Sequence, residues 1–206
     1  MCCDACCCVE RGSVRLFAAV DLDETARAAA AGSTHALATR LATADAPAPV
    51  RWVPPEQLHV TLRFLGEVSA WQAESVRRAL GVPWKTGAFS AGLADLDCFP
   101  FSGAPRVIWL GMDEGREQMA ALKDELDDRL VSIGFESETR PFRAHLTLGR
   151  VNRPVAVSGP ELRAILSEHR PETARWVVDR VTLYESRVSS RGAAHHVVES
   201  TMLAPS

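Results

Sequence analysis

Apolar and polar positions along the 206-residue chain follow two periods, one typical of strands and one typical of helices. Strand-like stretches occupy residues 14–20, 51–53, 58–65, 87–99, 106–112, 142–151, 176–184 and 194–202. Apolar residues at helical spacing predict helices over 21–43, 70–80, 114–133 and 160–169. Asp21 or Asp23 is placed to cap the first helix, Gly66 to end the strand at 58–65, and Gly134 to stop the third helix.

The order of these elements indicates the fold class. Several predicted strands follow one another closely along the chain, which favours antiparallel pairing. We therefore expect an α+β fold with the helices packed outside the sheets. Because no low-complexity linker divides the chain, we expect residues 13–206 to form one domain and residues 1–12 to form a disordered tail.

The cysteines are concentrated in that tail. Five of the six lie within the first eight residues, and the sixth is Cys98. A disulfide framework would spread its cysteines along the chain, and the Cys-x-x-Cys of Cys3 and Cys6 lacks a second ligand pair at zinc-site spacing. The body of the chain therefore fits a reduced, cytoplasmic protein, and we expect no bound metal or cofactor. No secretory signal and no membrane-spanning apolar run is visible, and we expect a monomer.

The charge balance narrows the possible partners. The formal net charge is -3 and the pI is about 6.1, which argues against broad, non-specific binding to duplex DNA but leaves room for a local basic cleft. All basic residues except Lys85 and Lys123 are Arg. Arg suits bidentate phosphate recognition, although a coding bias toward Arg and Ala explains the same composition.

One short motif occurs twice, as His-Val-Thr-Leu at 59–62 and as His-Leu-Thr-Leu at 145–148. Residues i and i+2 of a strand point to the same face, so each His shares a face with its Thr while the apolar residues point into the core. Two unrelated strands with polar faces would give the same pattern. The repeat instead favours two similar lobes, each of which contributes one His-x-Thr face to a shared groove.

Such a pair of histidines suits the opening of a cyclic phosphodiester. The reaction needs a base to take a proton from water and an acid to protonate the leaving ribose oxygen, and an imidazole serves either role near pH 7. Thr61 and Thr147 can donate hydrogen bonds to the phosphate oxygens, where negative charge accumulates. A nearby Arg would add charge-assisted hydrogen bonds, and no metal is required.

Neighbouring residues allow a functional or a structural interpretation. Strand alternation places Arg63 on the face of His59 and Thr61, within reach of RNA phosphate, or else at a solvated edge. Phe64 fits the core more readily than it fits base stacking. The other histidines have no matching Thr, and we interpret them as structural or exposed; they are His35, His169, His195 and His196.

The segments around both motifs resemble the two-histidine phosphoesterases, and most closely the bacterial and archaeal RNA 2′,3′-cyclic phosphodiesterases, also called 2′-5′ RNA ligases. The resemblance rests on the segments Arg-Leu-Phe-Ala-Ala-Val-Asp at 15–21, Val-Arg-Trp-Val-Pro-Pro-Glu-Gln-Leu-His-Val-Thr-Leu-Arg-Phe-Leu-Gly-Glu-Val at 50–68, Phe-Arg-Ala-His-Leu-Thr-Leu-Gly-Arg at 142–150 and Val-Thr-Leu-Tyr-Glu-Ser at 181–186. It covers roughly residues 14–203. His195 and His196 stand where relatives have an aromatic residue.

The resemblance implies a bilobal fold in which two antiparallel sheets are related by a pseudo-twofold axis around a central cleft. It implies hydrolysis of 2′,3′-cyclic phosphate RNA ends to 2′-phosphomonoesters without a metal, with weak reverse 2′-5′ ligation. By position, His59 and His145 match the family's catalytic histidines, with His59 favoured as acid and His145 as base. Thr61, Thr147 and Arg150 match its phosphate-binding residues. RNA with cyclic phosphate ends, including tRNA fragments, is then the expected partner.

Other functions fit the same residues. The site would also accept a cyclic nucleotide, an ADP-ribose 1″,2″-cyclic phosphate or an oligoadenylate. A non-catalytic RNA-binding domain of this fold is a second class, although both intact His-x-Thr motifs argue against it. A metal-dependent esterase that uses the Cys-rich tail as a metal module is a third.

Overall fold

The computed structural model describes residues 12–43, 50–152, 159–189 and 192–205. The predicted tail at 1–12, apart from Gly12, and the loop expected at 45–49 lie outside these residues. Within them, no helix is long and apolar enough to cross a membrane.

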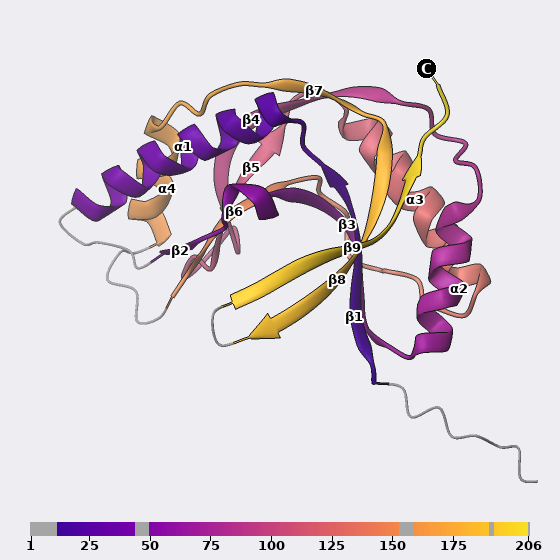
Figure 1. Ribbon diagram of the computed structural model, residues 1–206. Helices are drawn as coiled ribbons and strands as arrows, with labels where there is room; N and C mark the ends of the chain where they lie inside the picture. Colours follow the sequence, from indigo (N-terminus) through magenta and orange to yellow (C-terminus); the bar gives the residue numbers. More distant parts are fainter. Residues whose placement is uncertain (1–11, 44–49, 153–158, 190–191, 206) are drawn as a thin grey trace, which may run out of the picture.

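The described residues alternate between strands and helices, which confirms the α+β class (Figure 1). The elements, in chain order, are β1 (Val14–Asp21), α1 (Glu24–Thr43), β2 (Val50–Trp52), the 3-10 helix η1 (Pro55–Gln57), β3 (His59–Val68), α2 (Ala70–Gly81), β4 (Phe89–Phe99), β5 (Val107–Met112), α3 (Arg116–Ser132), β6 (Leu146–Val151), α4 (Gly159–Glu168), β7 (Arg175–Val178), β8 (Arg180–Ser189) and β9 (Gly192–Met202).

The strands form one curled, antiparallel sheet in the order β7-β4-β5-β6-β3-β1-β8-β9, with β2 added alongside β6. The expectation of two separate sheets is therefore wrong. The two halves join at the centre, where β3 and β6 pair through Val60 and Leu146 alone. These are the strands that carry the repeated motif, so the junction of the halves brings both copies together.

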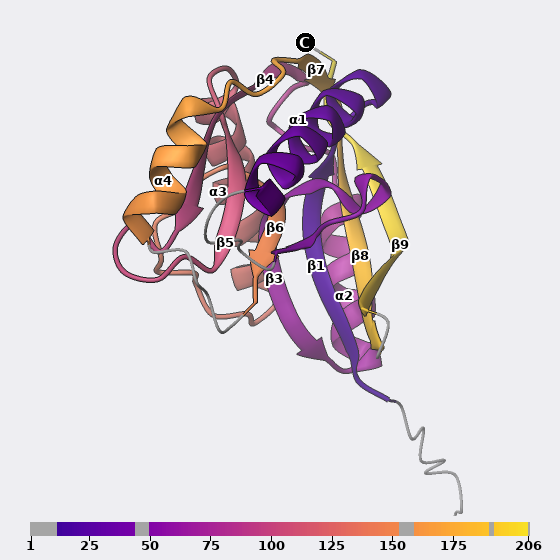
Figure 2. The same ribbon diagram turned by 90° about the vertical axis from the view of Figure 1, so that its left-hand side faces the viewer.

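Helices cover the sheet from two sides (Figures 1 and 2). Helices α2 and α3 lie side by side and pack against β1, β3 and β9, while α1 lies over β7 and η1, and α4 lies against β4. The apolar stripe predicted for the third helix is confirmed, because Met119, Leu122, Leu126 and Leu130 are all buried on α3. Gly134 ends that helix with a positive φ of 94°, as the sequence predicted.

Several boundaries differ from the expected ones. Asp23, not Asp21, caps α1 by accepting a hydrogen bond from the backbone of Ala26 (2.8 Å). The single strand expected at 176–184 is two strands, because the chain changes its pairing partner at Asp179, from β4 to β1. Strand β3 runs on through Gly66, whose positive φ of 75° fits a bulge against β1.

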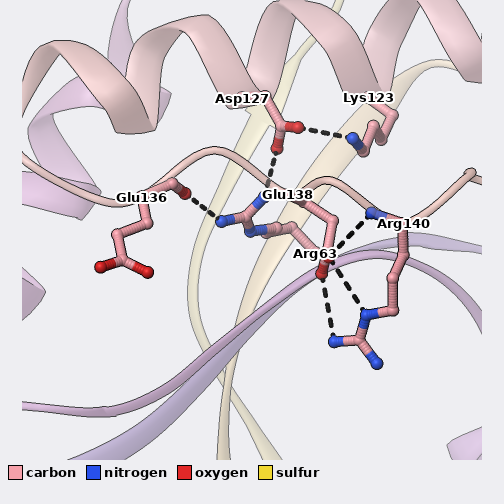
Figure 3. A network of polar contacts seen from close by, with 6 residues as sticks. All are labelled: Arg63, Lys123, Asp127, Glu136, Glu138 and Arg140. Carbon is pink, nitrogen blue, oxygen red and sulfur yellow. Dashed lines mark hydrogen bonds and ion pairs between the residues drawn. The ribbon is translucent and has the colours of Figure 1, made fainter.

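A second bulge in β3 changes which side chains face which way. Ala19 pairs with Thr61 and Ala18 with Arg63, so one extra residue, Leu62, is inserted between them. Alternation therefore breaks after Thr61, and the expectation that Arg63 shares its face is wrong. Figure 3 shows the result: the Arg63 guanidinium donates to Asp127 of α3 (3.1 Å) and to the carbonyl of Glu136.

Candidate active site

The two motif histidines begin the central strands. His59 is the first residue of β3, and His145 immediately precedes β6. Continuing the antiparallel register of Val60 and Leu146 by one residue each way sets His59 opposite Thr147 and Thr61 opposite His145. In this register His59 and His145 are diagonal neighbours, which lie about 7–8 Å apart in an antiparallel ladder. Each histidine thus has the threonine of the other motif beside it, and both line one cavity.

Both imidazoles are held in the same way. His59 Nδ1 lies 2.8 Å from the carbonyl oxygen of Gln57, and His145 Nδ1 lies 2.8 Å from that of Arg143, in each case two residues upstream. A carbonyl only accepts, so Nδ1 carries the hydrogen in both rings. In each neutral imidazole Nε2 is then left as the free acceptor, which can take a proton or, once protonated, return it.

Aromatic rings form the walls behind the histidines. Phe17 packs against the His59 ring at a centroid distance of 4.9 Å, and Phe99 and Trp109 contact the His145 ring at 5.2 and 5.8 Å. These contacts restrict the rotation of both imidazoles and remove water from one side of each ring. The reactive nitrogens are therefore held in a partly dry environment, where electrostatic interactions with a phosphate are strengthened.

Burial also determines the protonation of the pair. The pKa of His59 is lowered from its ordinary value of 6.5 to about 4, chiefly because burial disfavours the charged ring, with a smaller contribution from the neighbouring charge of His195. Desolvation likewise lowers the pKa of His145, with a further contribution from Arg150. Both rings are therefore neutral at pH 7 before any substrate enters. An anionic phosphate would raise both pKa values, because it favours the protonated imidazole.

The remaining predicted residues join the histidines in one cavity of about 690 Å³, a size suited to a small ligand. Thr61, Thr147 and Arg150 all line it. Arg150 of β6 pairs directly with Arg51 of β2, and both side chains are exposed. Two like charges opposite each other destabilise a sheet unless an anion lies between them. Both arginines line the cavity that Thr147 also lines.

The cavity is basic although the chain carries net negative charge. Its charged lining residues, among those that the structure describes, are Arg15, Arg51, Arg140 and Arg150, with no Asp or Glu. Of these four, Arg15, Arg51 and Arg150 form no ion pair within the described part of the chain. The local basic cleft that the composition allowed is therefore present, and it coincides with the histidines.

One site residue was missed by the sequence interpretation. His195 of β9 packs edge-on against His59 at 5.3 Å and against Phe17 at 4.9 Å, and it lines the same cavity. It reaches the site because Ser186 of β8 pairs with His195 in the terminal hairpin. The sequence predicted a structural or exposed place for His195 and did not predict that it lines the same cavity as His59.

Phe64 also differs from its expected place. The bulge after Thr61 turns it to the cavity face, where its ring lies 5.8 Å from Phe17. It remains 67% exposed, so the expectation that it fills the core is wrong.

A second cavity of about 530 Å³ lies on the far side of His59 and His195. It is lined by acidic residues as well as arginines, among them Asp21, Asp179 and Arg27. Asp21 accepts hydrogen bonds from Tyr184 and Thr182, which fixes the strands β1 and β8 behind His59. The mixed charge of this second cavity suits an anionic phosphate less well than the basic lining of the first cavity does.

Residue types that ligate metals do not gather in the described part of the chain. Over residues 12–43, 50–152, 159–189 and 192–205, no group of three His, Cys, Asp or Glu side chains is arranged as a metal site. The Cys-x-x-Cys of Cys3 and Cys6 lies outside those ranges.

Comparison with known proteins places this site in a family. The model of the 2′-5′ RNA ligase superfamily matches residues 27–189. The chain belongs to this superfamily. An RNA 2′,3′-cyclic phosphodiesterase of Archaeoglobus fulgidus is 32% identical over 161 residues, which are 78% of this chain and 83% of that protein. One of Methanothermobacter thermautotrophicus is 31% identical over 90% of this chain and 97% of its own length.

Several solved structures have the same fold as this chain. A protein of Thermus thermophilus superimposes with a TM-score of 0.73 at 26% identity, over 93% of this chain and 98% of that one. Escherichia coli LigT, crystallised with 3′-AMP, superimposes with a TM-score of 0.68 at 26% identity over the same shares of the two chains. The family resemblance expected from the motif segments is thus confirmed.

Proposed function

We propose that this member of the superfamily hydrolyses 2′,3′-cyclic phosphates at RNA ends to 2′-phosphomonoesters. The observation that carries the proposal is the convergence in one cavity of two Nδ1-anchored histidines, two threonines and three arginines that form no ion pair with other described residues. A cyclic phosphodiester needs an acid, a base and donors to its oxygens, and this set supplies all three. The relatives that carry the name RNA 2′,3′-cyclic phosphodiesterase support the same reaction.

The proposed mechanism places one imidazole on each side of the phosphorus. His145 Nε2 takes a proton from water as the water oxygen attacks phosphorus in line with O3′. The bond between phosphorus and O3′ breaks, and His59 Nε2 gives its proton to O3′. The products are a 3′-hydroxyl and a 2′-phosphomonoester, with His145 protonated and His59 neutral; exchange with solvent restores both.

Thr61, Thr147 and Arg150 act on the phosphate in this proposal. The two hydroxyls donate to the non-bridging oxygens, and Arg150 balances the charge that builds on them. No step requires a metal ion. The same steps in the same direction, with an RNA 5′-hydroxyl in place of water as the nucleophile, would break the bond between phosphorus and O3′ and join two ends through a 2′-5′ linkage. The proposal retains the single catalytic domain expected over residues 13–206, its two pseudo-twofold-related halves and its monomeric state.

The same chemistry on a cyclic mononucleotide is the second candidate function. The cavity volume favours it, since about 690 Å³ accommodates a single nucleotide. The kcat/KM values for an RNA 2′,3′-cyclic phosphate and for a cyclic mononucleotide decide between the two functions.

The pH dependence of kcat/KM follows from the lowered pKa values. The reaction needs one histidine protonated and one neutral, so the active fraction peaks midway between the two pKa values whichever ring is the acid. Both values lie below 6.5 because burial disfavours the charged rings. We therefore expect kcat/KM, which reports the free protein, to be highest below pH 6.5, and kcat to peak at higher pH. A kcat/KM optimum at pH 8 would contradict this account.

A turnover assay tests the proposed function. Purified protein is incubated with an oligoribonucleotide that ends in a 2′,3′-cyclic phosphate, in EDTA, and loss of the cyclic phosphate is followed by mass. We expect turnover in EDTA, whereas the same oligonucleotide with a 3′-phosphate end stays unchanged. An intact cyclic phosphate, or turnover only after a divalent metal is added, would overturn the proposal.

A further inference from the structure

The cavity contains more arginines than one cyclic phosphate can contact. Arg15 lies six residues before Asp21 on β1, and Asp21 pairs with His59. At about 3.3 Å per residue this separation is about 20 Å of strand. A phosphate held between His59 and His145 therefore lies beyond the reach of Arg15, which still lines the cavity and forms no ion pair in the described part of the chain.

An exposed aromatic ring lies between these two points. Phe64 is 67% exposed and lines the cavity next to Gly66, one ring contact beyond Phe17, which itself packs on His59. Burying this ring in the core would stabilise the fold, yet the bulge after Thr61 turns it toward the cavity. A base stacked on Phe64 would cover the exposed face.

A third residue, Arg140, reaches the same part of the cavity from the loop before β6. Arg140 Nε and one of its terminal nitrogens donate to Glu138 (3.1 and 3.4 Å), and the other terminal nitrogen has no hydrogen-bond partner among the described residues (Figure 3). The loop is held against β3 because Arg63, whose side chain is 10% exposed, donates to the Glu136 carbonyl. Arg140 is thus presented at a fixed place although its side chain is 86% exposed.

We propose that Arg15, Phe64 and Arg140 form an RNA tract, which binds the strand on the 5′ side of the cyclic phosphate. Alternating cationic and aromatic side chains are the arrangement that binds single-stranded RNA, with arginines on phosphates and rings on bases. A cyclic mononucleotide has one phosphate, which the histidines and threonines already occupy. The tract thus selects oligoribonucleotides over cyclic mononucleotides. This inference rests on the proposed function.

A substrate-length comparison tests the RNA tract. The kcat/KM is measured for 2′,3′-cyclic AMP and for a four-nucleotide oligoadenylate that ends in a 2′,3′-cyclic phosphate. We expect the ratio of oligonucleotide to mononucleotide kcat/KM to exceed about 10 in the wild type and to fall at least about fivefold in Phe64→Ala. For the oligonucleotide, log kcat/KM is plotted against the logarithm of the salt concentration. In Arg15→Ala or Arg140→Ala the negative slope of this plot should decrease in magnitude by about 0.7, the value of one lost phosphate contact.

Two matched variants serve as controls. Trp71→Ala removes an aromatic ring that is 70% exposed on α2, and Arg116→Ala removes an exposed arginine on α3, both outside the cavity. Neither should change the ratio or the salt dependence. If neither substrate is opened, the proposed function fails. If both are opened with equal kcat/KM, or if Phe64→Ala leaves the ratio unchanged, the RNA tract is refuted while the function stands.

Discussion

Replacing His59 or His145 with alanine is expected to lower kcat/KM for an RNA 2′,3′-cyclic phosphate at least about 100-fold, the scale of losing a general acid or base. Each imidazole supplies one proton transfer that no neighbouring side chain can take over. His195 lies beside His59 but comes from another strand, and among the described residues its ring forms no hydrogen bond to a backbone carbonyl. Because the two histidines act as a unit, the double variant should lose little more than either single one.

His35→Ala is the matched control for these variants. His35 is exposed on α1 and lines neither cavity, so its loss should leave kcat/KM within about twofold. Urea unfolding of all variants checks that the fold is retained. Wild-type rates in folded His59→Ala or His145→Ala would refute the acid–base assignment.

The second large effect is on stability and concerns Asp127. Its carboxylate binds two cations at once, Arg63 of β3 and Lys123 of the preceding helical turn (Figure 3). The side chains of Arg63 and Lys123 are only 10% and 7% exposed. Asp127→Ala removes the carboxylate that both charges share in a poorly solvated place and leaves Arg63 with the neutral Glu136 carbonyl, which costs about 3–5 kcal/mol. This is a large part of a typical domain stability of about 5–15 kcal/mol.

Urea denaturation measures this cost as a shift of the unfolding midpoint at constant slope. Asp124→Ala and Asp128→Ala remove exposed carboxylates from the same helix and should change the unfolding free energy by less than about 0.5 kcal/mol. An Asp127→Ala midpoint equal to those of the two controls would show that the ion pairs contribute nothing net.

Local signals predicted much of the fold. The stripe of Met119, Leu122, Leu126 and Leu130 identified α3 because helical periodicity depends only on neighbours in sequence. Both His-x-Thr strands were recognised for the same reason. The break at Asp179 was hidden, because apolar residues stand on both sides of Asp179 and Arg180, and the change shows only in the strand with which each segment pairs.

The residues that sequence reasoning missed or misplaced depend on long-range pairing. A single extra residue at Leu62 turns Arg63 to α3 and Phe64 to the cavity, and no local pattern marks that bulge. Arg51 meets Arg150 only because β2 pairs with β6, and His195 meets His59 only through the terminal hairpin. Such pairings are set by packing of the whole sheet, so a single sequence without its fold does not reveal them.

The identity of the product tests the central claim most directly. An oligoribonucleotide ending in a 2′,3′-cyclic phosphate is incubated in EDTA with the wild type, His59→Ala and His145→Ala, and the terminal phosphate is located by NMR. The two-histidine account predicts a 2′-phosphate with a free 3′-hydroxyl from the wild type and intact substrate from both variants. A 3′-phosphate product, or equal opening by all three proteins, would contradict it.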